Sequence, residues 1–217
     1  MKITWLGHSS FRLEESTGTT VVTDPYDSYV GYDMPEVRAD IVTVSHSHKD
    51  HNCTEKVLGT PEVLTHSGAY DISGVHILAR KTHHDNEDGA KRGGNLVFKF
   101  RMDGVDICHM GDIGEECNAI LVDSIAPVNV LMIPVGGNYT IDAEQAKEFV
   151  DRIMPDVVIP MHYKTKDCNF DIARLGEFLD LFDDEDIVYT ESDTVEFDRA
   201  DFDGESTKVF VLERFTD

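Results

Sequence analysis

Basic residues are scarce in this chain of 217 residues, which has 19 Lys and Arg against 42 Asp and Glu and a formal net charge of −23. Such a protein repels phosphate groups, so we expect neither a nucleic acid nor a membrane surface as its partner. A small molecule or a protein is the partner that remains as the default, and we expect a small-molecule substrate. Much of the acidity falls within residues 171–205, which we interpret as a solvated acidic face.

Long apolar runs and paired cysteine motifs are also missing. No apolar run approaches the ~20 residues of a membrane span, and the start MKITWLGHSS lacks the apolar stretch of a signal peptide. Four cysteines without a Cys-x-x-Cys pair are typical of reduced thiols. We therefore expect a cytoplasmic protein. The absence of a Pro/Gly/Ser-rich linker predicts one α/β domain over residues 1–217.

Short β-rich runs recur along the chain and predict strands: KITWL, TTVVTD, DIVTVSH, PEVLTH, GVHILAR, VNVLMIPVGG and DVVIPMHY. NLVFKFRMDGVDICHMGD carries Asp-Gly between two such runs, which predicts a β-hairpin. Residues 142–154 predict a helix that begins with a capping box of Asp142 and Gln145. Its apolar face comprises Ala143, Ala146, Phe149, Val150 and Ile153. Residues 171–182 predict a second helix.

The densest polar cluster follows one of these strands, in IVTVSHSHKDH at residues 41–51. Side chains alternate along an extended chain, so the imidazoles of His46 and His48 point to the same side and can converge on one ion. Asp50 and His51 are adjacent, and a turn of the chain would aim them at a second ion. Because VDICHMGD and DVVIPMHY also end in His or Asp, we expect the functional groups to collect at one rim of a sheet.

HSHKDH resembles the His-x-His-x-Asp-His signature of the metallo-β-lactamase superfamily. WLGHSSFRLE, VVTDPY, THHDNEDGAKRGGN, HMGDIG, IPVGGNYT and VIPMHY resemble successive blocks of one branch, the predicted metal-dependent hydrolases related to ascorbate-phosphate lactonases. The resemblance implies a four-layer αββα sandwich with a two-metal site at the sheet rim. After HMGDIG the chain continues with EECNAILVDS, where the branch has a Gly-His continuation, so one wall of the site departs from the pattern.

The resemblance also implies seven metal ligands. The first ion takes His46, His48 and one histidine of KTHHD, the second ion takes Asp50, His51 and His162, and Asp112 bridges the two. For the KTHHD histidine we choose His84 over His83, because the family block places its ligand directly before an Asp. Five imidazoles and two carboxylates suit two divalent ions, with Zn preferred and Mn or Fe as alternatives.

Three further residues are candidates for supporting roles. His8 lies either near the site or in a surface turn, and Asp24 either orients a ligand histidine or forms a turn. Lys164 is either an exposed lysine or a binder of an anionic substrate group. The segment GAKRGGN at residues 89–95 lacks the spacing of a phosphate loop, and we interpret it as a flexible loop.

The predicted chemistry is hydrolysis of an ester, lactone or phosphodiester bond in a small molecule by a hydroxide that bridges two metal ions. Asp50, Asp112 and Tyr139 are the predicted catalytic residues, and either Asn138 or Tyr139 could donate to the developing oxyanion. The alternative functions are a nuclease of the same superfamily and a non-hydrolytic metal-binding or di-iron protein. Relatives commonly form oligomers, so the resemblance is compatible with a homo-oligomer.

Overall fold

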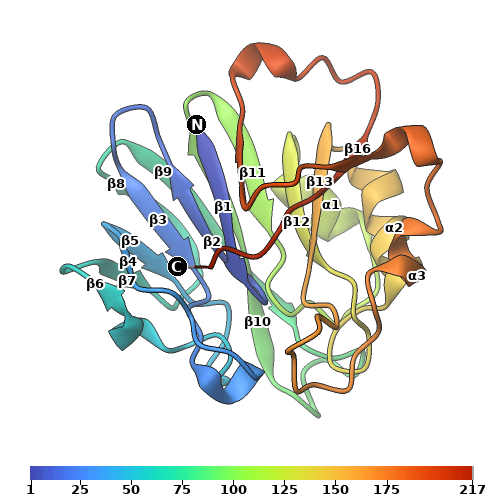
Figure 1. Ribbon diagram of the computed structural model, residues 1–217, viewed down its shortest axis with the longest axis horizontal. Helices are drawn as coiled ribbons and strands as arrows, with labels where there is room; N and C mark the ends of the chain where they lie inside the picture. Colours follow the sequence, from blue (N-terminus) through green and yellow to red (C-terminus); the bar gives the residue numbers. More distant parts are fainter. Residues whose placement is uncertain (217) are drawn as a thin grey trace.

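Two large β-sheets face each other in the computed structural model, which describes residues 1–216 (Figure 1). The first sheet has the order β15 (Thr194–Glu196), β1 (Lys2–Gly7), β2 (Ser10–Glu14), β3 (Thr20–Thr23), β5 (Ile41–Thr43), β7 (Glu62–Leu64). The second has the order β14 (Ile187–Tyr189), β16 (Lys208–Val211), β13 (Val157–Met161), β12 (Val130–Pro134), β11 (Val105–His109), β10 (Gly94–Met102), β9 (Val75–His83), β8 (Gly68–Ile72). A small third sheet pairs β4 (Val37–Arg38) with β6 (Val57–Leu58).

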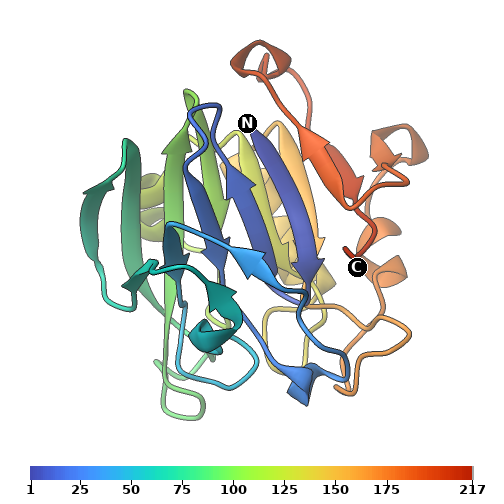
Figure 2. The ribbon, with the colours of Figure 1, turned by 60° about the vertical axis from the view of Figure 1, so that its left-hand side comes forward.

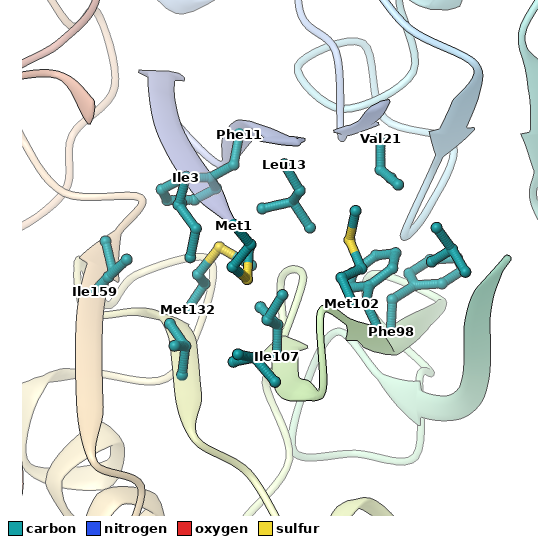
Figure 3. Close-up of a cluster of buried hydrophobic side chains, with 14 of the residues drawn as sticks. Met1, Ile3, Phe11, Leu13, Val21, Phe98, Met102, Ile107, Met132 and Ile159 are labelled. Carbon is teal, nitrogen blue, oxygen red and sulfur yellow. The ribbon is translucent and has the colours of Figure 1, made fainter. Parts of the chain in front are cut away.

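The main core fills the space between the two large sheets. Ile3 and Phe11 of the first sheet and Phe98, Ile107 and Met132 of the second are fully buried, and Figure 3 shows them pointing into one cluster. Burying each such side chain contributes about 1.5–3 kcal/mol, which holds the sheets face to face.

Helices cover the outer face of the eight-stranded sheet (Figures 1 and 2). They are α1 (Ala119–Ile125), α2 (Ala143–Ile153) and α3 (Gly176–Leu179). The predicted capping box of α2 is confirmed, because Asp142 accepts from the Gln145 backbone N–H and the Gln145 side chain accepts from the Asp142 N–H. Its predicted apolar face is confirmed as well, since all five of its residues are buried.

Irregular segments cover the outer face of the six-stranded sheet. There Val22 and Val42 of the sheet pack with Tyr26, Cys168 and Ile172 from loops. The chain also forms short 3₁₀ turns, at η1 (Ser28–Val30), η2 (Thr54–Lys56), η3 (Asp184–Asp186) and η4 (Arg199–Asp201). The α/β sandwich implied by the resemblance is confirmed, with loops and 3₁₀ turns instead of α-helices as the layer over this sheet.

The helix predicted over residues 171–182 is much shorter than expected, because α3 spans only Gly176–Leu179. The residues before it bond to neighbouring loops: the Ala173 N–H donates to the Gly136 carbonyl at 2.7 Å, and the Lys164 N–H donates to the Ala173 carbonyl at 2.8 Å. An apolar spacing that fits a helix therefore arises here from an extended segment followed by a single turn. α1 falls in the divergent segment EECNAILVDS and was not expected from the sequence.

The predicted hairpin joins β10 and β11, with Met102 opposite Val105. Asp103 and Gly104 both have positive φ, 50° and 76°, as a type I′ turn requires. No helix within residues 1–216 combines the length and the apolarity that crossing a membrane would need.

Several strands run in the same direction and end at the same rim, and six of them directly precede predicted metal ligands or the supporting residues His8 and Asp24. In the first sheet they are β1, β3 and β5, and in the second they are β9, β11 and β13. The loops that follow them gather at the lower edge of the molecule in Figure 1. Ligands commonly bind at the carboxyl ends of parallel strands, so this rim is the place to look for a site.

Candidate metal centre

Polar side chains follow β1, β3, β5, β9, β11 and β13 at this rim. His8 follows β1, Asp24 follows β3, the segment 46–51 follows β5, His84 follows β9, Asp112 follows β11, and His162 follows β13. The fold thus brings together residues that are far apart in the sequence.

The first group of candidate ligands is His46, His48 and His84, whose nearest ring nitrogens lie within 4.8 Å of one another. The ring centroid of His46 lies 4.6 Å from that of His48 and 4.5 Å from that of His84. His83 points elsewhere: its Nδ1 lies 2.8 Å from Glu115 Oε2, and its side chain is 42 % exposed. The structure therefore places His84, and not His83, beside the other two histidines.

The second group is His8, Asp50, His51 and His162, whose ligand atoms also lie within 4.8 Å of one another. Asp50 Oδ2 lies 3.4 Å from His51 Nε2 and 3.3 Å from His8 Nε2. The His8 ring is 4.3 Å from the His162 ring, centroid to centroid. His8, which the sequence left open between the site and a surface turn, is buried inside this group.

Asp112 lies between the two groups. Its Oδ2 is 3.2 Å from His51 Nε2 and 3.3 Å from His162 Nε2 of the second group. The same oxygen is 3.5 Å from His84 Nε2 and 3.8 Å from His46 Nε2 of the first group. One carboxylate oxygen is therefore shared by both groups.

Asp24 supports one histidine of each group on the side facing away from the centre, His51 directly and His46 through Ser45. Its carboxylate accepts hydrogen bonds from the Ser45 N–H at 2.7 Å and the Ser45 hydroxyl at 2.6 Å, and lies 2.9 Å from His51 Nδ1. The Ser45 hydroxyl also lies 2.9 Å from His46 Nδ1. Since Ser45 donates to Asp24, it accepts from His46, so Nδ1 of both histidines donates a hydrogen bond and Nε2 of both is directed at the site.

The backbone is strained at several of these positions. His8, Asp24, Asn138 and His162 all have positive φ, between 39° and 57°. Such conformations cost about 1 kcal/mol or more each for non-glycine residues and concentrate at functional sites. Gly111, directly before Asp112, also has positive φ, 57°, and a Cβ there would lie 2.4 Å from Asn95 Oδ1.

Burial and mutual contacts shift the proton affinities of these groups. Burial lowers the pKa of His46 to about 3 and that of His8 to about 4, so both imidazoles are neutral at pH 7. Although burial alone would raise it, the pKa of Asp112 is held well below its ordinary value by His162 and His51. Burial opposes the charge of His51 too, but the Asp112 carboxylate raises its pKa well above the ordinary value.

The donors of this centre fit divalent ions. Within residues 1–216, His46 Nε2, His51 Nε2 and Asp112 Oδ1 are buried without a hydrogen-bond partner, which is costly unless something else occupies these atoms. Imidazole nitrogen and carboxylate oxygen are ligands of Zn, Mn and Fe. The two groups with Asp112 between them can therefore hold metal.

A cleft of about 510 Å³ opens onto the centre. Its lining includes His84, Asp112, Tyr139 and Arg92. Arg92 lies in GAKRGGN, so sequence reasoning missed it by interpreting that segment as a flexible loop. Its basic character was the only signal available.

Two other candidates are engaged elsewhere and do not line the cleft. The Asn138 side chain donates to the Asp171 carbonyl at 2.7 Å, and the Lys164 ammonium donates to the Phe170 carbonyl. Both side chains therefore help to hold the loops at residues 164–171.

Comparisons with known proteins agree with this geometry. Residues 2–162 match the family model of the Beta-lactamase superfamily domain. A UPF0173 metal-dependent hydrolase of Carboxydothermus hydrogenoformans is 30 % identical over 209 residues, covering 83 % of this chain and 91 % of that protein.

Solved structures of the metallo-β-lactamase fold also superpose on this chain. The crystal structure of a candidate Zn-dependent hydrolase of the metallo-β-lactamase superfamily from Thermotoga maritima superposes with a TM-score of 0.80 and 38 % identity, covering 98 % of this chain and 99 % of that one. A diiron β-hydroxylase from Streptomyces venezuelae shares the fold alone, with a TM-score of 0.56 and 16 % identity over 74 % of this chain and 44 % of that one.

Proposed function

The chain belongs to the metallo-β-lactamase superfamily and is a metal-dependent hydrolase, and we propose that it binds two divalent ions and cleaves an ester, lactone or phosphodiester bond in a small molecule. The single observation that carries the dinuclear proposal is the position of Asp112. One oxygen of this carboxylate lies within 3.8 Å of imidazole nitrogens from both groups of candidate ligands. A carboxylate shared in this way is suited to bridge two ions.

Each ion has its own proposed ligands. His46, His48 and His84 would hold the first, Asp50, His51 and His162 would hold the second, and Asp112 would contact both. We propose zinc as the resident metal, with manganese and iron as the alternatives that the same donors accept. When bound, such ions lower the pKa of a shared water towards ~7 and polarise a carbonyl or phosphoryl oxygen of the substrate.

The residues around the ions have distinct proposed tasks. Asp24 keeps the Nε2 lone pair of His51 directed at the centre, because its carboxylate engages Nδ1. His8 positions Asp50, whose Oδ2 is 3.3 Å from the His8 ring. Tyr139 lines the cleft, whereas the Asn138 amide is bonded to Asp171, so we assign donation to the developing oxyanion to Tyr139.

A hydrolysis panel on protein of measured metal content tests this proposal. The panel contains aryl esters, lactones, phosphodiesters, thioesters and amides, and Asp112→Ala serves as the mechanistic control. We expect turnover of at least one class, with two ions per chain and a loss of both activity and metal in the variant. Undiminished activity of Asp112→Ala would exclude the two-metal mechanism.

The same panel separates the proposed function from its rivals. Single-stranded RNA and DNA are included at low salt, where a nuclease would cleave them despite the net charge of −23. A di-iron protein would contain iron and turn over none of the hydrolytic substrates. Either result would contradict the proposed function as a small-molecule hydrolase.

A further inference from the structure

The cleft of the metal centre is lined by a cation, Arg92. Arg92 lines this cleft together with His84, Asp112 and Tyr139. Although the chain has 42 acidic residues, no carboxylate among residues 1–216 lies within 4.0 Å of the Arg92 guanidinium, and that group makes no hydrogen bond to the described protein. Its neighbour Lys91, in contrast, pairs with Glu87 at 2.6 Å.

The segment that carries Arg92 is tied down by hydrogen bonds. The Asp85 carboxylate accepts from four backbone N–H groups, those of Glu87, Gly89, Lys91 and Arg92, at 2.7–2.9 Å. These bonds lower the pKa of Asp85 to about 2 although its burial alone would raise it. Because Asp85 directly follows His84, the loop that presents Arg92 is anchored at the metal centre itself.

The side chain of Arg92 is also supported. Its guanidinium carbon lies 5.1 Å from the centroid of the Tyr139 ring, a cation–π contact that restricts its motion. Tyr139 packs edge-on against Phe170 with ring centroids 5.9 Å apart, and Phe170 packs in the same way against Tyr29 at 5.6 Å. All three aromatic residues line the cleft, so one wall is apolar and ends in a cation.

We propose that Arg92 binds an anionic group of the substrate, a carboxylate or a phosphate, while the body of the substrate lies along the aromatic wall and its scissile bond faces the metal centre. A guanidinium offers paired N–H donors that match the oxygens of both anions. An acidic protein repels anions at long range, so a fixed cation inside the cleft is what retains one. The substrate class is therefore a small organic anion with a planar or apolar body. This inference rests on the proposed hydrolase function.

Matched esters test the proposal in turnover. Phenyl acetate is compared with 4-carboxyphenyl acetate on the metal-loaded wild type and on Arg92→Ala, Arg92→Lys and Lys91→Ala. We expect wild type to prefer the carboxylated ester and Arg92→Ala to lose about 10- to 100-fold in kcat/KM on that ester only. Arg92→Lys should recover part of the loss, and Lys91→Ala should match wild type. Equal losses on both esters in Arg92→Ala would overturn the assignment.

A binding measurement keeps the two proposals separable. Calorimetric titration with 4-hydroxybenzoate, 4-hydroxyphenyl phosphate and phenol needs no turnover. We expect at least one anion to bind more tightly than phenol to wild type, and the tighter one identifies the group. Arg92→Ala should lose that advantage. If Arg92→Ala binds the anions as tightly as wild type, or if wild type does not distinguish them from phenol, Arg92 is not the anion site. Failure to hydrolyse any class of the hydrolysis panel would instead count against the proposed function.

Discussion

The two groups of candidate ligands differ in how they meet solvent. In the first group His48 is exposed, and both His48 and His84 line the cleft. In the second group His8, His51 and His162 have side chains at most 1 % exposed, and only Asp50 reaches the cleft. Of the two proposed metal positions, the first is therefore open to the cleft and the second is enclosed by the surrounding protein; we call them the open and the sealed position.

The support behind the two groups differs as well. His51 in the sealed group contacts the Asp24 carboxylate directly, whereas His46 in the open group reaches it only through Ser45. Burial and a charged partner both favour a rigid position. We therefore expect the ion of the sealed group to exchange more slowly than that of the open group.

Removal of metal has the largest expected effect. Prolonged chelation should abolish hydrolysis, by about 10³-fold or more, because the ions supply several kcal/mol of transition-state stabilisation. Metal should leave in two phases, with the open position emptied first. A metallochromic indicator measures this release. Release in a single phase would contradict the contrast between the groups. Restoring activity with Zn, Mn or Fe in turn identifies the functional ion.

Loss of a ligand from the open group ranks second. His84→Ala should bind one ion instead of two. Its kcat/KM should fall by more than the roughly 10- to 100-fold that is typical when a residue that only supports a ligand is removed. His83→Ala is the matched control, since His83 pairs with Glu115 away from the centre. Elemental analysis together with kcat/KM measures both variants. Full metal content in His84→Ala, with loss in His83→Ala, would reverse the assignment.

Removal of the shared support comes third. Asp24→Ala should weaken metal binding by about 10- to 100-fold, since His51 and, through Ser45, His46 lose the partner that sets their tautomers. Ser45→Ala should have the smaller effect and act mainly on the open group. Metal titration of both variants gives the comparison. Equal losses at both positions in Ser45→Ala would show that the two groups are not supported separately.

Substitution within the sealed group should have a smaller effect. His8→Gln removes the ring that lies 3.3 Å from Asp50 Oδ2. We expect the affinity for the second ion to fall about tenfold and the affinity for the first ion to stay unchanged. His76→Gln is a suitable control, because His76 lies on the exterior with a 64 % exposed side chain. A lower affinity for the first ion would show that the assignment of His8 to the sealed group is wrong.

The smallest effect is expected far from both groups. Asp142→Ala removes the capping box of α2 and should cost about 1 kcal/mol of unfolding free energy. Denaturant unfolding of the metal-loaded protein measures this loss. Metal content and kcat/KM should remain at wild-type values, and a change in either would mean that the helix layer contributes to the centre.

Local patterns made a large part of the fold predictable. The capping box of Asp142 and Gln145 and the Asp-Gly hairpin each depend on a few adjacent residues, and both appear as expected. The helix expected over residues 171–182 shows the limit of this approach. Its apolar spacing matched a helix, but Ile172 packs under the first sheet while Phe178 packs against the second. Tertiary contacts decided its length.

For the centre, the sequence alone determined that residues 46–51 carry a dense set of candidate ligands at the end of a strand. The resemblance implied that His84, Asp112 and His162 join them, but only the tertiary structure brings these residues together: all three follow strands of the eight-stranded sheet, and they meet residues 46–51 from the facing sheet at one rim. The tertiary structure also decided the position of Arg92, whose backbone is bound to Asp85 and whose guanidinium lies over Tyr139. Periodicity acts within one segment, whereas these meetings depend on how separate segments pack.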